Sequence, residues 1–319
     1  MPGWSRRRRG RGFEYRDETG ELLTGADRQR CIDLVIPPAW REVWICPLPH
    51  GHLQATGLDD LGRRQYVYHP VWRERREREK FDHTLVLARN LPRARRRARK
   101  DLALIGVPRA RALAVAFMLL DFGLFRIGSP RYEERHGSYG LSTIRAHQLS
   151  FTQSGVRFEF AGKSHVEQEV TVDHEPLVRA LRALTRGREP EERLLHYRDS
   201  HEEGDLNAEQ INEYIELLVG PGATAKDFRT WHATVFAACQ LALRGGNSYK
   251  ERQASVREVV NATAQLLGNT PAVARASYID PRVIDAHLHG EHINMAQKTM
   301  PPGPPFPPRA ENAVLDFLT

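Results

Sequence analysis

The local pattern of the sequence changes near residue 80, and this change constrains the fold more than any other feature. Residues 13–80 contain short alternating and aromatic runs separated by turn residues, a pattern typical of β-strands. From residue 175 to about residue 292 the pattern is mainly helical, with Asp205 or Asn207 able to cap one helix and Thr224 the next. Together the two patterns predict an α+β fold, with a small β-rich N-terminal domain followed by a larger, mainly α-helical domain.

A second block of strands lies within the helical part of the chain. Strand-like runs occur at residues 147–151, 156–160 and 165–172. The last two runs are joined by the sequence Ala-Gly-Lys-Ser at residues 161–164, which predicts the tip of a β-hairpin. We therefore expect the helical domain, residues 81–295, to include a small β-hairpin sheet.

The two ends of the chain differ in composition from the parts between them. Residues 1–12 are rich in Arg and Gly, which predicts a basic disordered arm ahead of the β-rich domain at residues 13–80. Residues 300–308 contain six prolines in nine positions, so we expect an extended, proline-rich tail at residues 296–319.

Positive charge is concentrated in the first third of the chain. Residues 1–100 hold 23 basic and 13 acidic residues, whereas residues 101–319 hold 24 basic and 27 acidic residues. Such asymmetry is typical of proteins that bind a polyanion, most often nucleic acid. A solvated basic surface without a partner has the same composition, so charge alone does not decide between the two.

Several classes of protein are excluded by the spacing of particular residues. Cys31, Cys46 and Cys239 form no CxxC pair, which argues against a zinc ribbon or a disulfide framework and favours a reducing compartment. No apolar run approaches the roughly 18 residues of a membrane span. The Gly-Lys-Ser sequence at residues 162–164 has Arg157 where a phosphate-binding P-loop needs glycine. The histidine clusters lack HExxH spacing, so we expect no metal site.

Five short motifs each carry one residue suited to chemistry on an anion. In chain order they are Arg126 in FRIG, Lys163 in AGKS, Arg229 in KDFRTWHA, Asn269 in LGNTP and Tyr278 in ASYIDP. Each residue alone also has an ordinary structural explanation, such as a helix end or an exposed turn. As a set they suit attack on a phosphodiester: a phenol as nucleophile, two guanidinium groups on the non-bridging oxygens, and an ammonium to protonate the leaving oxygen.

In this order the motifs resemble those of the type IB DNA topoisomerases, specifically their compact poxviral and bacterial form. The similarity covers roughly residues 13–295 and includes YGLSTIR after FRIG. By this resemblance Tyr278 is the nucleophile, Arg126 and Arg229 stabilise the transition state, and Lys163 is the general acid. The sequence GRRQYVY at residues 62–68 looks like the family's DNA-contacting strand. The DNA-contacting residues that we expect are Gln65, Tyr66, Tyr68, Tyr132 and Lys226.

The resemblance also implies a fold and a mechanism. The helical domain would have the tyrosine recombinase/topoisomerase IB fold. The tyrosine would nick one strand and hold it as a 3′-phosphotyrosine while the duplex swivels, and the 5′ hydroxyl would then reseal the break. Neither metal nor ATP is expected, because the phosphotyrosyl bond keeps the bond energy. We expect a monomer that closes around double-stranded DNA in the bacterial cytoplasm, at the nucleoid.

Asn269 is the one departure from the family pattern, which usually has histidine at this position. An amide can donate a hydrogen bond to a phosphate oxygen but cannot become cationic. Two other functions remain open. A tyrosine recombinase or integrase shares the chemistry, although its DNA-binding domain is usually helical rather than β-rich. A non-catalytic DNA-binding protein would share the charge distribution without the reaction.

Overall fold

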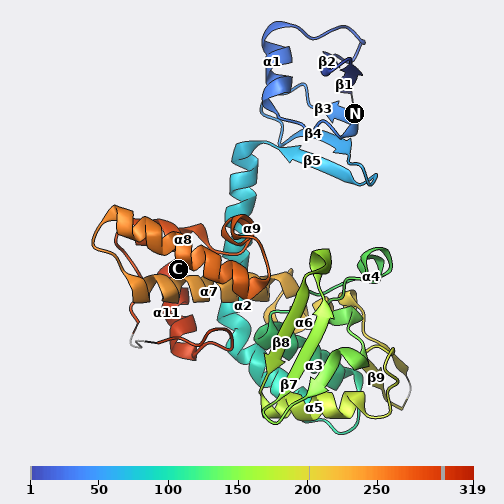
Figure 1. Ribbon diagram of the computed structural model, residues 1–319, viewed down its shortest axis with the longest axis vertical. Coiled ribbons are helices and arrows are strands. Elements are labelled where there is room, and N and C mark those ends of the chain that lie inside the picture. Colours follow the sequence, from blue (N-terminus) through green and yellow to red (C-terminus); the bar gives the residue numbers. More distant parts are fainter. Residues whose placement is uncertain (1, 201, 296–298) are drawn as a thin grey trace. The chain divides into compact units, whose positions relative to one another are not determined.

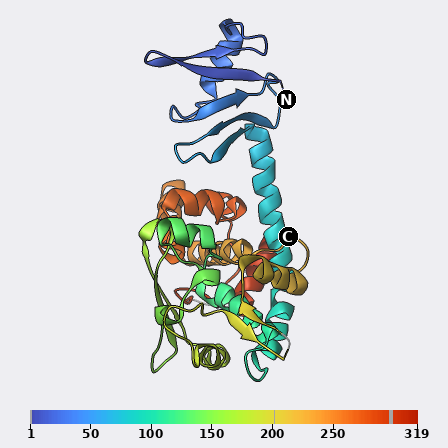
Figure 2. The same ribbon diagram turned by 90° about the vertical axis from the view of Figure 1, so that its right-hand side faces the viewer.

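The computed structural model describes residues 2–200, 202–295 and 299–319, without the side chains of Tyr132 and Ser164. The chain forms two compact units that divide between Lys80 and Phe81 (Figure 1). Helix α2 (Pro70–Leu102) includes this division, and Figure 2 shows the same elements after a quarter turn. Each unit has a hydrophobic core of its own.

The N-terminal unit is built on a five-stranded antiparallel sheet with the strand order β2-β1-β3-β4-β5. Its strands are β1 (Trp4–Arg9), β2 (Gly12–Arg16), β3 (Arg41–Ile45), β4 (Leu53–Leu58) and β5 (Arg64–Tyr68), and helix α1 spans Gly25–Asp33. Val43 and Ile45 of β3 alternate toward the core, where they meet Cys31 of α1. Period-2 burial of this kind is what the alternating sequence pattern predicts for a half-covered sheet.

The prediction of a disordered arm at residues 1–12 is wrong, because Trp4–Arg9 form strand β1. Trp4 and Arg6 alternate into the interior of the unit, and the Arg6 guanidinium donates hydrogen bonds to the carbonyl oxygens of Ile36, at 2.8 Å, and Trp40, at 2.9 Å. The backbone turns at Gly10, whose φ is +57°, before β2 pairs with β1. The Arg-rich composition predicts disorder because it suggests that all these arginines are solvated. Arg7 to Arg9 are indeed exposed, but Arg6 is buried and hydrogen-bonded to backbone carbonyl groups.

The second unit is mainly helical. Besides the larger part of α2, its helices are α3 (Arg109–Gly123), α4 (Pro130–His136), α5 (Glu175–Thr185), α6 (Ala208–Val219), α7 (Ala225–Arg244), α8 (Tyr249–Leu267), α9 (Pro271–Ser277), α10 (Pro281–Leu288) and α11 (Pro308–Leu318). Asn207 caps α6 through a hydrogen bond from Gln210 N, and Thr224 is the N-cap of α7. An antiparallel sheet with the order β6-β7-β8 joins β6 (Leu149–Phe151), β7 (Val156–Ala161) and β8 (Glu167–Val172). A short hairpin of β9 (His196–Arg198) and β10 (Glu203–Asp205) interrupts the region whose pattern is helical.

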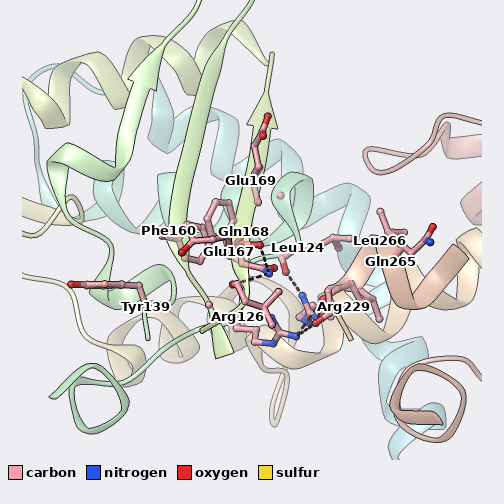
Figure 3. A pocket seen from close by; sticks show the side chains of 17 residues that line it. Leu124, Arg126, Tyr139, Phe160, Glu167, Gln168, Glu169, Arg229, Gln265 and Leu266 are labelled. Atoms are coloured by element: carbon pink, nitrogen blue, oxygen red, sulfur yellow. Dashed lines mark hydrogen bonds between the residues drawn. The ribbon is translucent and has the colours of Figure 1, made fainter. Parts of the chain in front are cut away.

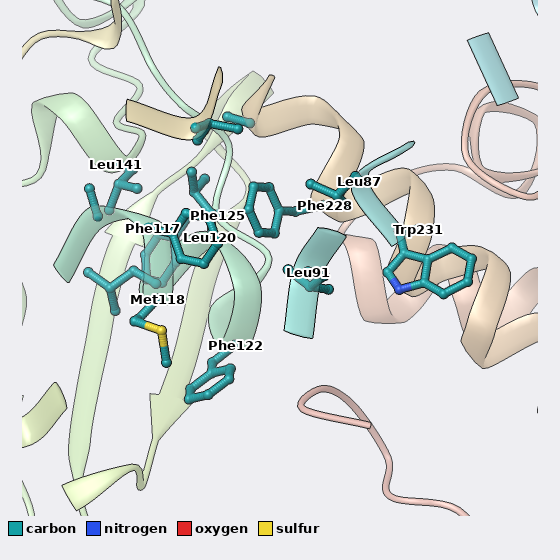
Figure 4. Close-up of a cluster of buried hydrophobic side chains, with 14 of the residues drawn as sticks. Leu87, Leu91, Phe117, Met118, Leu120, Phe122, Phe125, Leu141, Phe228 and Trp231 are labelled. Carbon is teal, nitrogen blue, oxygen red and sulfur yellow. The ribbon is translucent and has the colours of Figure 1, made fainter. Parts of the chain in front are cut away.

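Helix α3 is the centre of this unit, because it is apolar on all sides from Ala112 to Leu120 and buried from Ala112 to Phe122. Phe117 packs edge-on against Phe228 of α7, with ring centres 5.1 Å apart, and Phe125 packs in the same way against Phe158 of β7 at 5.0 Å. Figure 4 shows Phe117, Phe125 and Phe228 among the buried aromatic and aliphatic side chains that α2, α3 and α7 contribute to the core. The core therefore joins the end of α3 to both the small sheet and α7.

The proline-rich tail is not an extended arm over its whole length, because its last residues form α11. Ala310, Val314 and Leu318 recur at every fourth position and are buried, which gives the helix one apolar face. Phe306 is also only 2% exposed. Most of the prolines precede the helix, so the composition of the tail predicts an extended segment although a short helical pattern follows. Residues 296–298 lie outside the described part of the chain.

These observations confirm the α+β fold class, with its β-rich N-terminal region and its larger helical part that carries a small hairpin sheet. Within the described residues, no helix has both the length and the apolar character needed to cross a membrane.

Candidate active site

Four of the five side chains predicted to act on an anion meet where α3, α7, α8 and α9 end or begin. Arg126 follows the end of α3, Arg229 lies in the first turns of α7, Asn269 lies between α8 and α9, and Tyr278 ends α9. The two guanidinium groups share one acceptor, the carbonyl oxygen of Leu267, at 3.3 Å from Arg126 and 2.7 Å from Arg229. Figure 3 shows these two arginines together near the end of the β7–β8 hairpin where β7 finishes and β8 begins, beside Phe160 and Gln168.

Arg229 is the more deeply buried cation, with only 4% of its surface exposed. Its Nη1 donates to the carbonyl oxygen of Leu124, a residue whose φ of +54° ends α3 in the left-handed region. Burial first, and then the charge of Arg126, lower the pKa of Arg229 to about 10. The guanidinium is therefore cationic at neutral pH. The hydrogen-bond acceptors described for it are backbone carbonyl oxygens and not carboxylates. A buried cation held in this way keeps its charge available to an anionic ligand.

Arg126 is held by the backbone that follows it. Leu141 N donates to the carbonyl oxygen of Arg126 at 2.8 Å, so the two family-like motifs FRIG and YGLSTIR pair with each other. Gly128 and Gly140 make this approach possible, because a Cβ at Gly140 would lie 2.5 Å from Gly128 Cα. The Arg126 side chain then reaches the carbonyl oxygen of Gly268 at 2.8 Å. Burial lowers its pKa from the ordinary arginine value.

The side-chain amide of Asn269 is oriented by the Arg126 guanidinium. Its Oδ1 accepts a hydrogen bond from Arg126 Nη2 at 2.6 Å. Because the oxygen takes the guanidinium donor, the Nδ2 group is the one directed elsewhere, and this buried nitrogen has no hydrogen-bond partner among the described residues. A buried amide donor without a partner is costly unless a ligand satisfies it. The helix cap that could have explained an asparagine here is instead Thr270, whose Oγ1 accepts from Val273 N.

Tyr278 lies beside the cations. The guanidinium carbon of Arg229 is 5.3 Å from the centre of its ring, and Nζ of Lys226 is 6.0 Å from it. Burial alone would raise the pKa of the phenol, but the charges of Arg229, Lys226 and Arg126 outweigh it, so the net effect lowers that pKa. Compared with a tyrosine in water, the site therefore stabilises the phenolate, the nucleophilic form of the side chain.

The structure does not join Lys163 to this cluster by any described contact. Lys163 is exposed in a tight turn, Lys163–His165, between β7 and β8. A strand follows this turn, so the turn is not the start of a helix and no P-loop is formed. The rest of the hairpin does reach the site: a pocket of about 300 Å³ is lined by Gly162 and Gln168 of the hairpin and by the two arginines.

The residues predicted to contact DNA lie in both units. On β5, Gln65 donates to Asp59 Oδ2 at 2.9 Å, and Tyr66 is 48% exposed. The ring of Tyr66 stacks on that of Tyr68, with their centres 5.9 Å apart. In the second unit, Lys226 is exposed in the first turn of α7. Tyr132 belongs to α4, but its side chain lies outside the described part of the structure.

Two residues that the motifs do not single out fix the backbone around Tyr278. Thr234 Oγ1 donates to the carbonyl oxygen of Tyr278 at 3.2 Å and accepts from Asp280 N at 3.1 Å. Asp280 then caps α10 and pairs with Arg282 at 2.7 Å. The Asp-Pro sequence is a signal for a helix start, whereas a threonine inside the apolar helix α7 gives no indication of its partner.

Comparison with known proteins identifies relatives of both units. A family model described as the catalytic core of eukaryotic DNA topoisomerase I matches residues 69–299. A second model, described as the N-terminal domain of bacterial DNA topoisomerase IB, matches residues 12–59. All five residues of the predicted catalytic set lie within the first match, whereas α11 lies beyond it.

Three individual proteins extend this similarity. The DNA topoisomerase 1B of Acanthamoeba polyphaga mimivirus is 26% identical over 312 residues, which are 95% of this chain and 92% of that protein. The DNA topoisomerase 1 of Rabbit fibroma virus (strain Kasza) is 22% identical over 249 residues, which are 75% of this chain and 73% of that protein. The DNA topoisomerase 1 alpha of Arabidopsis thaliana is 26% identical over 161 residues, which are 50% of this chain and 16% of that protein.

Proposed function

Because this chain belongs to the type IB DNA topoisomerase family, as the catalytic-core match over residues 69–299 establishes, we propose that it relaxes supercoiled DNA through a transient phosphotyrosyl bond. One observation carries this proposal above the others: the ring centre of Tyr278 lies 5.3 Å from the guanidinium carbon of the buried Arg229. That arrangement supplies a nucleophile and a cation for the charge that develops on the phosphate.

In the cleavage step, the Tyr278 oxygen attacks the scissile phosphorus while the bond from phosphorus to the 5′ oxygen breaks. The upstream strand is then held by a 3′-phosphotyrosyl bond, and the downstream strand ends in a 5′ hydroxyl. Arg126 and Arg229 hold the two non-bridging oxygens, and their carbonyl-held guanidinium groups support this role. The unpartnered Nδ2 of Asn269 donates a further hydrogen bond to the same phosphate.

Lys163 is the general acid in this scheme. The departing 5′ oxygen needs a proton, and the ammonium group of Lys163 delivers it once DNA lies across the site. Gly162, the residue before it, lines the pocket with Arg126 and Arg229, and this placement supports the assignment. Religation reverses the same steps: the 5′ hydroxyl attacks phosphorus and gives its proton back to the Lys163 amine, and the Tyr278 phenolate departs.

The phosphotyrosyl bond conserves the energy of the broken phosphodiester, so the proposed reaction consumes no ATP and its charge stabilisation comes from side chains rather than a metal ion. The protein acts as a monomer that closes around double-stranded DNA. Gln65, Tyr66 and Tyr68 of β5, together with Tyr132 and Lys226, contact the duplex. The match to a bacterial N-terminal domain supports a place at the nucleoid, in the bacterial cytoplasm.

The test is relaxation of supercoiled plasmid in the presence of a chelator and without ATP. Wild-type protein is expected to relax the plasmid completely, and the Tyr278→Phe variant, which lacks only the phenolic oxygen, is expected to bind DNA without relaxing it. Recombinant plasmid products would instead favour a tyrosine recombinase. DNA binding without any relaxation by the wild type would favour a non-catalytic DNA-binding protein.

A further inference from the structure

Four charged or ionisable side chains from four helices meet inside the second unit, in a cluster that the proposed reaction does not use. They are Arg95 of α2, Asp121 of α3, His232 of α7 and Glu311 of α11. Arg95 donates to both oxygens of Asp121, at 2.7 and 2.9 Å, and to both oxygens of Glu311, at 2.6 and 2.8 Å. One guanidinium therefore holds two carboxylates in bidentate geometry.

The histidine completes the cluster on the side of α7. His232 Nε2 lies 2.9 Å from Asp121 Oδ1, and its Nδ1 lies 4.0 Å from Glu311 Oε1. Burial would raise the pKa of Asp121, but Arg95 and His232 outweigh it and hold that pKa below the ordinary value. The carboxylate thus stays charged, and removing one member of such a buried set leaves the others incompletely paired.

This cluster lies one helical turn from Arg229. The end of α3 and the start of α7 are joined by two contacts: Asp121 with His232, and the Leu124 carbonyl oxygen with Arg229. Asp121 and Leu124 are three residues apart, and so are Arg229 and His232. Because three residues make about one helical turn, the two contacts are neighbours along the same pair of segments. The Asp121–His232 pair and the Leu124–Arg229 pair therefore join the same two segments, one helical turn apart.

Helix α11 supplies the fourth member of the cluster, although in the sequence it follows the matched catalytic core, which ends at residue 299. Glu311 is buried, and its helix packs through Val314 and Leu318. Phe306, just before the helix, lies with its ring centre 5.7 Å from that of His232. The last segment of the chain thus touches the same histidine through both an aromatic ring and a carboxylate.

We propose that Glu311 of α11 is a positioning residue for Arg229. Its carboxylate holds Arg95, Arg95 holds Asp121, and Asp121 with His232 sets α3 against α7 where Arg229 faces the phosphate. Glu311 itself touches no DNA and transfers no proton. This inference rests on the proposed function, in which Arg229 binds a non-bridging oxygen of the scissile phosphate.

The test compares Glu311→Gln with Asp316→Asn in the full chain. Both variants replace a carboxylate of α11 by its amide, but Asp316 is exposed. Single-turnover cleavage is measured at saturating DNA, with thermal unfolding and DNA affinity measured in parallel. Glu311→Gln is expected to cleave roughly 10–100-fold more slowly, because small misplacement of a positioning group has effects of this size, while Asp316→Asn matches the wild type.

A second substrate separates positioning from a general loss of structure. Replacing a non-bridging oxygen of the scissile phosphate by a methyl group removes the charge that Arg229 stabilises, so the defect of a variant that misplaces Arg229 should shrink on this methylphosphonate. Arg229→Ala shows how far the defect shrinks when the cation itself is missing. If Glu311→Gln does not fold, Glu311→Asp, which keeps the charge on a shorter side chain, takes its place.

An equal defect on both substrates, or no defect in a folded variant, would overturn the positioning role. These outcomes are distinct from failure of the proposed function, in which the wild-type protein would form no covalent adduct with either substrate.

Discussion

Arg126 Nη2 donates a 2.6 Å hydrogen bond to the side-chain oxygen of Asn269. This contact orients the amide so that its Nδ2 group remains without a partner in the described structure. Where the resemblance leads us to expect a histidine, Arg126 thus orients the neutral amide of Asn269 so that its Nδ2 group can donate to a ligand. The arrangement leads to a specific expectation for each substitution of the asparagine.

Removing the amide of Asn269 should slow cleavage, because a donor to the developing charge is lost. Asn269→Ala is expected to lose about 10²–10³-fold, as for a typical oxyanion-hole donor. Asn269→His should keep substantial activity, since imidazole also donates. Asn269→Asp should be more severely impaired than the alanine variant, because its carboxylate repels the phosphate and competes with it for Arg126. Single-turnover cleavage measures all three.

Thermal unfolding of the same three variants is the control. Thr270 rather than Asn269 caps α9, so the substitutions should leave the helix folded. A stable and fully active Asn269→Asp protein would contradict the role of this residue as a donor to phosphate.

The pKa of Tyr278 should respond to Arg229. Burial raises that pKa, and the charge of Arg229 is the main influence that lowers it below the ordinary value of 10.0. A lower pKa means more phenolate at a given pH, so loss of the cation should move the titration to higher pH. The tyrosinate absorbance of wild type minus that of Tyr278→Phe follows this one residue. Its midpoint should lie below 10.0 and rise in Arg229→Ala, and an unchanged midpoint would show that Arg229 does not act on the phenol.

Lys163 is expected to matter only when the leaving oxygen needs a proton. Lys163→Ala should slow cleavage by about 10²–10⁴-fold on ordinary DNA. A substrate with sulfur in place of the bridging 5′ oxygen has a much better leaving group, so this variant should cleave it almost as fast as the wild type does. Equal defects on both substrates would move Lys163 from the acid role to charge stabilisation.

Strand β1 changes how the basic N-terminus should be tested. Deleting residues 1–12 would remove a strand that pairs with both β2 and β3, so point substitutions are needed. Arg7 and Arg8 are exposed on β1, and each of them that contacts a phosphate adds about 0.9 to the steepness of log K against log salt. The variant with both replaced by Gln should show a flatter slope and an unchanged cleavage rate at saturating DNA. An unchanged slope would mean that this strand does not touch DNA.

Much of the site is predictable from short motifs because those motifs specify backbone geometry as well as side chains. The glycines of FRIG and YGLSTIR permit the close pairing that holds Arg126. The Gly-Asn-Thr-Pro sequence ends one helix and starts the next, which places Asn269 at the junction. The position of Lys163 in the site is not predictable in this way. Its side chain is exposed in the turn between β7 and β8, so a bound ligand rather than the local backbone decides where its ammonium group lies.

Besides the β9–β10 hairpin inside the region predicted to be helical, the errors of sequence interpretation fall at the two ends of the chain, and those two share a cause. Composition predicts exposure there, but single residues decide otherwise: Arg6 is buried against backbone carbonyls, and Glu311 against Arg95. The partners of Glu311 lie up to 216 positions away in the sequence. No local pattern identifies a charged residue whose counter-charge comes from a distant helix.

The most direct test of the central claim is to trap the covalent intermediate on a duplex whose scissile strand is labelled at its 5′ end. After denaturation, the label should migrate with the wild-type protein, because the upstream strand is held through its 3′ phosphate, and peptide mapping should place it on Tyr278. The Tyr278→Phe variant should yield no adduct although it binds the same duplex. An adduct on another residue, an adduct that retains only a 3′-end label, or an undiminished adduct in the Phe variant would contradict the account.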